Sequence, residues 1–400
     1  MGASNREGNL MANRFIDLQV AARLGLREAR RWLRGEREPA PDVSQFRETL
    51  DRALAAIPEC VVADHAWIQL PASEPPWRDS GIALRAGEEL SYFAAGRVLV
   101  SAALDIWVTP KTQIWARIGE AGPIRSSSRD SNTLRAEREG RLFFGNYFPN
   151  DWKDTSGARL QPDSVYAGMA GEIWILAVRW CGRAEDGLAA LAAAGDATGI
   201  VASERERLAL GDPTPPGWHY LWHLGDAEIF RASQGPSGEP ALHCEVIGDV
   251  GILQRDTAFA LRADTEISWR WRVDAVPGLF REDTVPSHDY LSLAVEFANG
   301  LDLTYYWSKS LPVGTAYWCP LPNWKHREFH IVIRSGSEGL GSWLAERRNL
   351  HADALRHFGT HPGDIVRVWL IASSVFKRQR GSFRIADIRL RSATEEQVVL

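Results

Sequence analysis

Side chains able to transfer a proton are concentrated between residues 287 and 308. The run Ser287-His288-Asp289-Tyr290 offers hydroxyl, imidazole and carboxylate groups, and Tyr306 follows near the end of the stretch. Histidine and carboxylates are the commonest general acids and bases, and tyrosine can act as a base where nearby cations stabilise its phenolate. Adjacent residues of a strand point to opposite faces, so His288 and Asp289 enter one cleft only across a bulge. We predict Tyr306 and His288 as proton-transfer groups and Asp289 as a substrate contact.

A stripe of arginines precedes this stretch. Arg270 and Arg272 alternate with Trp269 and Trp271. A guanidinium group binds carboxylates in a bidentate manner and stacks on aromatic rings, so the stripe suits an acidic or hydroxylated ligand. A solvated sheet face has the same pattern and is the commoner case. If a neighbouring strand brings the arginines to the side of Tyr306, they would also lower the pKa of its phenol.

A third group of candidates precedes a predicted helix near residues 350–358. A loop formed by residues 343–349 and folded over the same face would add Glu346 as a third catalytic group. In the alternative, this segment only joins a strand to the helix, and Glu346 pairs with an arginine. The residues predicted to bind substrate are Arg270, Arg272, Asp289, Tyr305, Trp307, Trp343, Arg347 and Asn349.

Few motifs indicate a metal or a common enzyme class. His219 and His223 are four residues apart, which places both imidazoles on one face of a helix, but no third ligand lies nearby in the sequence. There is no phosphate-binding Gly loop, dinucleotide fingerprint, G-x-S-x-G elbow or HExxH motif. The four cysteines are isolated, without CxxC spacing, as is typical of reduced structural thiols: Cys60, Cys181, Cys244 and Cys319. We predict no bound cofactor from these motifs.

Composition narrows the class of protein further. The 400 residues are 45% hydrophobic and 24% charged, which is typical of globular chains, and the formal net charge of −5 argues against a nucleic-acid partner. No run of about 18 apolar residues is present, so we expect no transmembrane span. The N-terminus lacks the apolar core of a signal peptide, and we therefore predict a cytoplasmic protein.

The candidate residues depend on a predicted β-hairpin over residues 289–308. Hydrophobic and polar residues alternate on both sides of Asn299-Gly300, and this dipeptide is the strongest short-range hairpin signal because both turn residues must tolerate positive φ. One face of the hairpin then belongs to a core. The other face carries Thr304, Tyr306 and Ser308.

Similar alternation elsewhere predicts a mainly β fold of two β-sandwiches of jelly-roll type, preceded by a short helical pair. The Pro-rich stretch Gly211–Gly217 sets the boundary between the sandwiches. The two amphipathic helices cannot bury their apolar stripes alone, so we expect them to pack on a β domain or to form a homo-oligomer contact. A partner or membrane surface is a further alternative for the basic first helix. The predicted domains are a helical segment (1–60), a first sandwich (61–182), a helical connector and linker (183–217) and a second sandwich with one inserted helix (218–400).

Three short motifs follow one another in residues 67–180: W-R-D-S-G-I, A-R-I-G-E-A-G-P-I and G-R-L-F-F-G-N-Y, before an Asp-rich loop. This order resembles the PA-IL-like galactose-binding lectin fold, in which an Asn-Asp pair and the following loop hold calcium. The resemblance makes Asn146, Asp151 and Asp154 candidate calcium ligands. Because Tyr147 replaces the Asp of the pair and Lys153 adds a cation, an ordinary solvated loop is the alternative. We expect weak or no calcium binding.

The second half contains S-W-R-W-R-V, D-Y, Y-Y-W-S and E-R-R-N-L in that order. This order resembles the bacterial family DUF3047 over roughly residues 220–392, which implies a fold and no activity.

Three functions are compatible with these observations. One is a carbohydrate- or glycan-directed enzyme of lyase or hydrolase type, with the lectin-like sandwich as an accessory module. The second is a non-catalytic carbohydrate-binding protein, and the third is an enzyme acting on a small apolar or aromatic substrate in a closed pocket lined by Trp and Tyr. Spacing reveals no glycosidase-like carboxylate pair, but a pure binding protein has no need of converging titratable groups. We therefore favour an enzyme whose ligand is a small molecule or an oligosaccharide.

Overall fold

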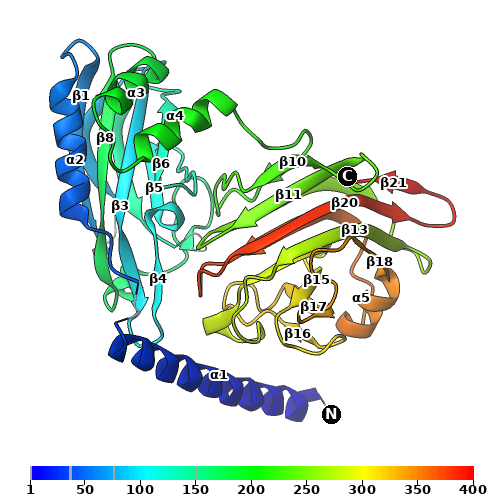
Figure 1. Ribbon diagram of the computed structural model, residues 1–400. Helices are drawn as coiled ribbons and strands as arrows, with labels where there is room; N and C mark the ends of the chain where they lie inside the picture. The colour runs from blue at the N-terminus through cyan, green and yellow to red at the C-terminus, as the bar shows by residue number, and fades with distance from the viewer. Residues whose placement is uncertain (1, 36–37, 75–76, 149–150) are drawn as a thin grey trace. The chain divides into compact units, whose positions relative to one another are not determined.

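The computed structural model describes residues 2–35, 38–74, 77–148 and 151–400 and is mainly β, with helices near the N-terminus, as predicted (Figure 1). The chain forms two compact units. The N-terminal unit comprises residues 31–212 and 222–227, and the C-terminal unit comprises residues 1–30, 213–221 and 228–400. One boundary falls within the Pro-rich stretch, between Asp212 and Pro213. Within the described ranges, no helix has the length and apolarity that a membrane span requires.

The N-terminal unit is a β-sandwich. A five-stranded sheet in the order β1-β8-β3-β4, with β6 also paired to β3, packs against the three-stranded sheet β2-β7-β5. Alternate residues of the two sheets, such as Ile68, Leu90, Leu142 and Ile175, form the core between them. The strands are β1 (Val62–Pro71), β2 (Arg78–Leu84), β3 (Glu89–Ser101), β4 (Ile106–Val108), β5 (Ile114–Ile118), β6 (Ser131–Arg135), β7 (Gly140–Asn146) and β8 (Ala170–Trp180).

Helices cover the second face of the five-stranded sheet. Helix α2 (Val43–Ala56) buries its apolar stripe with α3 (Ala184–Ala193) against β3 and β8, and α4 (Ile200–Leu210) follows α3. Asp42 caps α2 by accepting a hydrogen bond from the Gln45 amide at 2.9 Å, as the sequence predicts. The second predicted helix therefore packs on its own β domain.

The first predicted helix is α1 (Gly2–Leu33). Its second half exposes four large hydrophobic side chains, so the homo-oligomer contact stays a prediction for this helix: Leu18, Leu26, Trp32 and Leu33.

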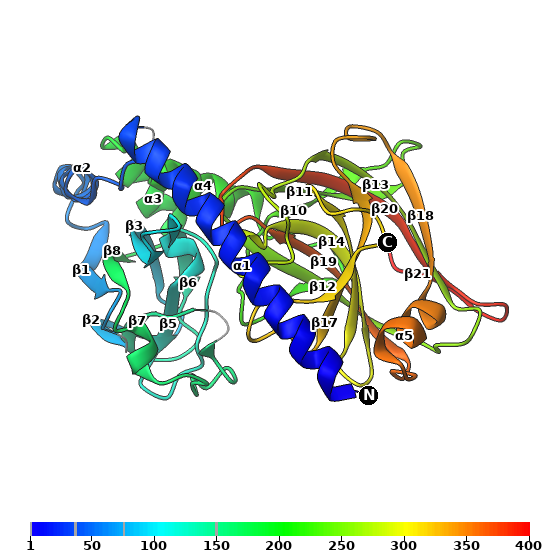
Figure 2. The same ribbon diagram turned by 90° about the horizontal axis from the view of Figure 1, so that it is seen from below.

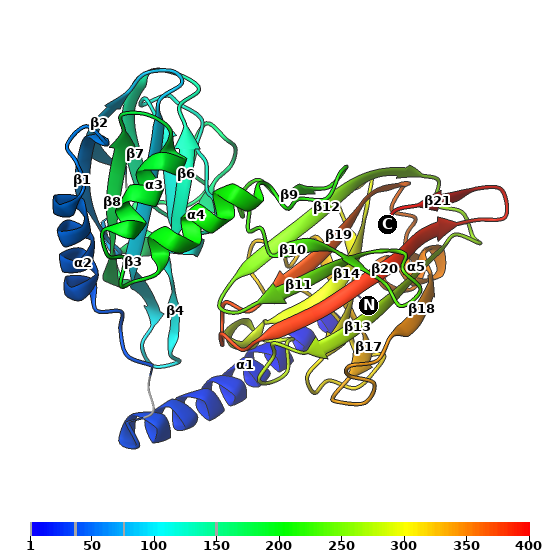
Figure 3. The same ribbon diagram turned by 45° about the horizontal axis from the view of Figure 1, so that its top comes forward.

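The C-terminal unit is a larger sandwich whose two layers are visible in Figure 2 and Figure 3. One layer has the order β10-β11-β20-β13-β18, with β21 also paired to β20, and the other has the order β16-β17-β15-β14-β19-β12-β9. We refer to them as the six-stranded and the seven-stranded sheet. The strands are β9 (His219–Tyr220), β10 (Phe230–Gln234), β11 (Pro240–Val246), β12 (Val250–Phe259), β13 (Glu266–Ala275), β14 (Tyr290–Phe297), β15 (Asp302–Ser308), β16 (Ala316–Trp318), β17 (Glu328–Ser335), β18 (Leu344–Asn349), β19 (Ile365–Ser373), β20 (Gly381–Arg391) and β21 (Glu396–Val398).

The predicted hairpin forms the middle of the seven-stranded sheet. Strands β14 and β15 pair in antiparallel register, with Ser292 opposite Tyr306, and Gly300 takes a φ of 79° at the turn. β17 then pairs with β15 in parallel, which places Thr304 beside His330. The hairpin prediction is confirmed, and its polar side gains residues from a strand that lies further along the chain.

The inserted helix is α5 (Leu350–Phe358). Asn349 accepts a hydrogen bond from the Ala352 amide at 2.7 Å, and Gly359 ends the helix with a φ of 74°. Both ends lie where the capping residues predict them.

Candidate functional site

The polar side of the hairpin lies on the face of the seven-stranded sheet that is directed away from the six-stranded sheet. Tyr305 and Trp307 of β15 pack inward on Trp269 and Trp271 of β13, with ring centroids 5.7 and 5.8 Å apart. Alternate residues must therefore point outward. The outer face is defined by Tyr290, Ser292, Asp302, Thr304, Tyr306, Glu328, His330 and Trp369.

This outer face is polar and yet buried. Ser292, Asp302, Thr304 and His330 have no exposed surface, and Glu328 is 3% exposed. Two segments enclose the face: residues 276–289, which lead into β14, and residues 309–327, which join β15 to β17 and include the edge strand β16. We refer to them as the first and second covering segments.

Rings from both covering segments pack on His330. The His288 ring of the first segment lies 5.0 Å from the His330 ring, and Tyr317 of the second segment stacks on His330 at 5.2 Å with a 6° interplanar angle. The same second segment places Trp324 against Trp369, at 6.2 Å. The outer face is thus enclosed by aromatic and imidazole rings.

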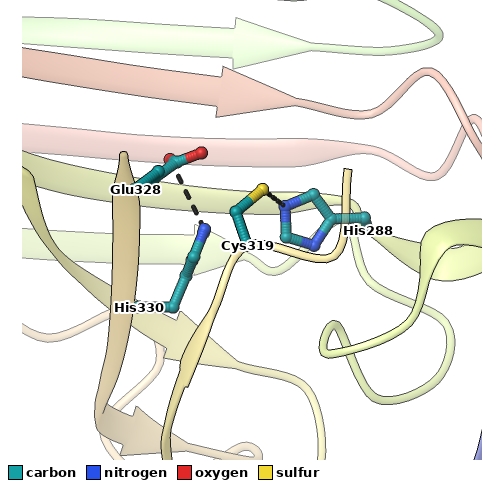
Figure 4. Close-up of side chains that lie close together, drawn as sticks. All are labelled: His288, Cys319, Glu328 and His330. Carbon is teal, nitrogen blue, oxygen red and sulfur yellow. Dashed lines mark hydrogen bonds and ion pairs between the residues drawn. The ribbon is translucent and has the colours of Figure 1, made fainter. Parts of the chain in front are cut away.

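Four potential metal ligands meet under this cover: His288, Cys319, Glu328 and His330. One ligand atom from each lies within 4.8 Å of all the others, and all four residues are buried. The Cys319 thiol is 3.4 Å from His288 Nε2, and His330 Nε2 is 3.4 Å from Glu328 Oε1 (Figure 4). We refer to these residues as the His-Cys-Glu cluster.

Hydrogen bonds orient two members of the cluster. His288 Nδ1 lies 2.5 Å from the Glu282 carbonyl oxygen, so Nδ1 carries the proton and the Nε2 lone pair is directed towards Cys319. The Tyr290 hydroxyl donates to Glu328 Oε1 at 2.9 Å. The Thr304 hydroxyl lies 2.9 Å from Asp302 Oδ1 and 3.4 Å from Glu328 Oε1, so it links the two carboxylates.

Burial dominates the electrostatics of the outer face. Burial, reinforced by His330, lowers the pKa of His288 to about 3, and the imidazole is neutral. Burial and the neighbouring Glu328 charge raise the pKa of Asp302 well above its usual range. Burial alone would raise the pKa of Glu328 as well, but His330 and a hydrogen bond from Tyr290 outweigh it and hold that pKa below its usual range.

Several polar atoms of the outer face have no hydrogen-bond partner. Both ring nitrogens of His330 are in this state, as are Asp302 Oδ2, Ser292 Oγ and Trp369 Nε1. A buried polar atom left without a partner costs roughly 1–3 kcal/mol, so such atoms are few in folded proteins and mark places where water, an ion or a ligand binds. Such atoms also occur in the N-terminal sandwich, at Gln113 and Asn146. On this face they lie beside the buried His-Cys-Glu cluster, and the combination makes it the candidate site.

The structure brings the two predicted proton-transfer groups to this site. His288 belongs to the cluster, and the Tyr306 ring lies 5.5 Å from the His330 ring. The Tyr306 hydroxyl shares a hydrogen bond of 2.8 Å with the Tyr317 hydroxyl. Burial, with the Glu282 charge, raises the pKa of Tyr306 well above its usual range, so the phenol is neutral and the predicted phenolate base is not supported.

The predicted arginines do not lie on this face, and that part of the prediction is wrong. β13 belongs to the six-stranded sheet, and since Trp269 and Trp271 point inward, Arg270 and Arg272 point outward on the far side of the sandwich. Arg270 pairs there with Glu239 at 3.2 Å. Arg272 pairs with Asp274 at 2.8 Å.

The segment 343–349 also fails to reach the outer face. Residues 344–349 form β18, a strand paired with β13, in place of the predicted loop. Glu346 accepts hydrogen bonds from Arg334 at 2.8 Å and from Trp271 Nε1 at 3.1 Å. The other predicted members have local roles: Trp343 lies near Arg270, Arg347 pairs with Glu266, and Asn349 caps α5.

The remaining predicted contacts are structural. The hydroxyl of Tyr305 donates to Asp353 at 2.8 Å, and Trp307 Nε1 donates to the Gly336 carbonyl at 3.0 Å. Asp289 accepts hydrogen bonds from the amides of Phe376 and Lys377, at 3.0 and 2.7 Å, and so anchors the loop between β19 and β20. These three side chains point away from the outer face.

The other metal candidates of the sequence take separate roles. His219 lies in strand β9, so the helical face that would join it to His223 does not exist. Asp151 accepts a hydrogen bond from the Tyr166 hydroxyl, and Asp154 accepts from the amide of Ser156 at 3.0 Å. Asn146 is buried at the end of β7, and neither amide atom of its side chain has a hydrogen-bond partner.

Sequence reasoning missed Asp302, Cys319 and Glu328 and gave His330 no role. Glu328 and His330 are two residues apart on one strand, the spacing that places both side chains on the same face. That spacing is the one local signal for the cluster. The parallel pairing of β17 with β15 and the position of Cys319 depend on the fold of the second covering segment.

One protein family of unknown function matches part of the second half of the chain. Residues 227–389 match the sequence model of the family described as "Protein of unknown function (DUF3047)", which confirms the predicted resemblance. Among curated proteins, none matches the chain.

Several solved structures are distantly similar, and they are carbohydrate-related β-sandwich proteins. The EclA N-terminal domain, a PllA-like lectin, is 17% identical and covers 30% of this chain and 99% of its own, with a TM-score of 0.23. The xyloglucanase domain of NopAA from Sinorhizobium fredii is 7% identical and covers 41% and 87%, with a TM-score of 0.27. A carbohydrate-binding module of the β-sandwich superfamily is 10% identical and covers 84% and 100%, with a TM-score of 0.26.

Proposed function

We propose that the protein is a carbohydrate-directed enzyme of hydrolase or lyase type, and that its reaction takes place on the outer face of the seven-stranded sheet. The observation that carries this proposal is the set of buried polar atoms without hydrogen-bond partners on that face, namely those of Ser292, Asp302, His330 and Trp369. Ionisable groups that are buried and strongly perturbed occur preferentially at functional sites. Folding stability alone gives no reason to bury them.

The chemistry of these atoms favours a hydroxylated ligand. Trp369 Nε1 can only donate a hydrogen bond, whereas Asp302 Oδ2 can accept one, and a sugar hydroxyl serves both. The Tyr290, Tyr306, Tyr317 and Trp369 rings around them supply the apolar surface that a sugar ring contacts with its C–H faces.

Two side chains are suited to move or hold a proton during the reaction. Asp302 has one unpartnered oxygen, and burial favours its protonated form, so it is the candidate proton donor. Tyr306 is neutral and hydrogen-bonded to Tyr317, so its role is to orient a substrate hydroxyl as a hydrogen-bond partner.

The two covering segments limit the size of the substrate. An open groove suits a long glycan, but here the two covering segments leave the outer-face side chains with almost no exposed surface. A compact substrate of one or a few sugar units, admitted when a covering segment moves, fits this arrangement better. The same enclosure keeps a small aromatic substrate as the second candidate, while the number of polar atoms favours the sugar.

The test is a thermal-shift screen of oligosaccharides, uronates and small aromatic compounds on the full chain, followed by product analysis of each hit. We expect a carbohydrate to raise the melting temperature and to be converted. Asp302→Asn should lower turnover about 100-fold or more while the ligand still binds. Asp256→Asn, an exposed residue of the same sheet that pairs with Arg367, is the matched control and should leave turnover unchanged.

Carbohydrate hits that are recovered chemically unchanged would favour a non-catalytic binding protein. Conversion of an aromatic compound alone would favour the second candidate. Normal turnover by Asp302→Asn would remove Asp302 from the mechanism.

A further inference from the structure

We propose that His288, Cys319, Glu328 and His330 bind one divalent transition-metal ion, with zinc the best fit, and that this ion fastens both covering segments to the seven-stranded sheet. The proposal concerns an ion bound by the protein itself and does not depend on the identity of the substrate.

The donor set selects the class of metal. A thiolate and two imidazoles are ligands that zinc prefers, and a carboxylate oxygen is a common fourth. Calcium and magnesium prefer sets made of oxygen alone, so a site with one carboxylate among four ligands does not suit them. The four residues supply the two imidazoles, the thiol and the carboxylate, one ligand atom each, and these atoms all lie within 4.8 Å of one another.

The distances fit a tetrahedral ion. With metal–ligand bonds of about 2.0–2.3 Å, neighbouring ligand atoms of a tetrahedron are about 3.3–3.8 Å apart. The Cys319 thiol and His288 Nε2 are 3.4 Å apart, as are His330 Nε2 and Glu328 Oε1. Two edges of the tetrahedron therefore already have the required length, and small side-chain movements close the others.

The surroundings hold the ligands in the orientation that metal binding requires. The Glu282 carbonyl oxygen accepts the Nδ1 proton of His288, which leaves Nε2 as the ligand atom. The Tyr290 hydroxyl donates to Glu328, and the Tyr317 ring stacks on His330. Such outer contacts accompany metal ligands and fix their geometry.

A second observation is independent of this geometry. His330 is completely buried; Nδ1 has no hydrogen-bond partner, and Nε2 has only a long contact of 3.4 Å with Glu328 Oε1 that lacks hydrogen-bond geometry. A buried imidazole in this state is costly, because it has lost its contacts with water and only the long contact with Glu328 replaces them. A metal ion bound at Nε2 would supply the missing partner.

The chain topology explains what the ion would do. His288 lies in the first covering segment, Cys319 lies in the second, and Glu328 and His330 lie on β17. The second segment is already paired with β17 through β16 and through the Cys319 amide, which donates to the Glu328 carbonyl at 2.9 Å. A single ion would therefore fasten the first segment to the sheet and add a side-chain link to the second. Four protein ligands fill the coordination sphere of the ion, as in structural zinc sites. We therefore assign the ion a structural role in holding the covering segments, and no role in the bond-breaking step.

The test begins with the full wild-type chain, stripped of metal by a chelator and titrated with Co²⁺. We expect binding of one ion per chain, the intense visible bands of tetrahedral Co²⁺, a near-ultraviolet thiolate-to-cobalt charge-transfer band, and displacement of Co²⁺ by Zn²⁺. Zinc should also raise the melting temperature. A folded wild-type chain that shows neither cobalt spectrum nor zinc-dependent stabilisation would overturn the proposal.

Two variants identify the ligands. Cys319→Ser should remove the charge-transfer band, and His330→Gln should weaken zinc binding by more than the roughly 10–100-fold that loss of an outer contact costs. Cys244→Ser is the matched control, because Cys244 is also buried in the C-terminal unit but lies on β11, in the six-stranded sheet. A charge-transfer band that persists in Cys319→Ser, or that disappears in Cys244→Ser, would contradict the assignment.

Discussion

The two outer faces of the C-terminal sandwich differ in the exposure and pairing of their ionisable side chains. On the six-stranded sheet, Arg270 and Arg272 are 34% and 39% exposed, and each pairs with an acidic neighbour. On the seven-stranded sheet, Asp302 and His330 have no exposed surface and keep polar atoms without partners. A solvated ion pair contributes about 1 kcal/mol or less and is easily accommodated, whereas buried polar atoms without partners are costly. The buried face is therefore the better indicator of function.

Removal of one carboxylate from each face should give the largest difference in the free energy of unfolding. Glu328→Ala leaves the Tyr290 hydroxyl unpaired and takes the carboxylate away from His330, so it should reduce the free energy of unfolding by about 3–5 kcal/mol. Glu239→Ala on the other face removes the partner of Arg270 and should cost about 1 kcal/mol or less. Urea denaturation of both variants measures the contrast. Equal losses of unfolding free energy in the two variants would contradict the proposed difference between the faces.

A smaller effect is expected from a single hydroxyl group on the buried face. Tyr306→Phe removes the hydrogen bond to the Tyr317 hydroxyl and leaves both rings in place, so it should reduce the free energy of unfolding by about 1 kcal/mol. If the hydroxyl also orients a substrate, ligand affinity measured by calorimetry should fall. Unchanged affinity for a carbohydrate hit would place the ligand elsewhere on the outer face.

The smallest effect is expected on the solvated face. Arg272→Ala breaks a half-exposed pair with Asp274 and should change the free energy of unfolding by less than about 1 kcal/mol. Ligand affinity should not change, because the arginine lies on the far side of the sandwich from Tyr306. Weaker ligand binding by this variant would indicate that the arginine stripe, and not the buried face, is the binding surface.

Local patterns were sufficient to predict the central hairpin and the inserted helix of this sandwich, but not strand β18. The alternation around Asn299-Gly300 predicts the β14–β15 hairpin and the face on which Tyr306 lies, because side chains of a strand alternate with a period of two. Asn349 and Gly359 predict both ends of α5, since capping depends on residues adjacent to the helix.

The partners of each strand could not be predicted in the same way. β13 precedes the hairpin in the sequence but pairs with β18 and β20, and this long-range choice separates the arginines from Tyr306. β15 pairs in parallel with β17 across the second covering segment. The His-Cys-Glu cluster depends on that pairing and on the path of the segment, so isolated residues such as Cys319 carry no local sign of it.

The metal site is tested most directly by anomalous diffraction at the zinc absorption edge, measured on crystals of the full chain grown with zinc. We expect one strong peak per chain at bonding distance from four atoms: His288 Nε2, Cys319 Sγ, a Glu328 carboxylate oxygen and a His330 ring nitrogen. Ordered crystals that show no peak there, or zinc only at surface side chains, would contradict the proposed metal site.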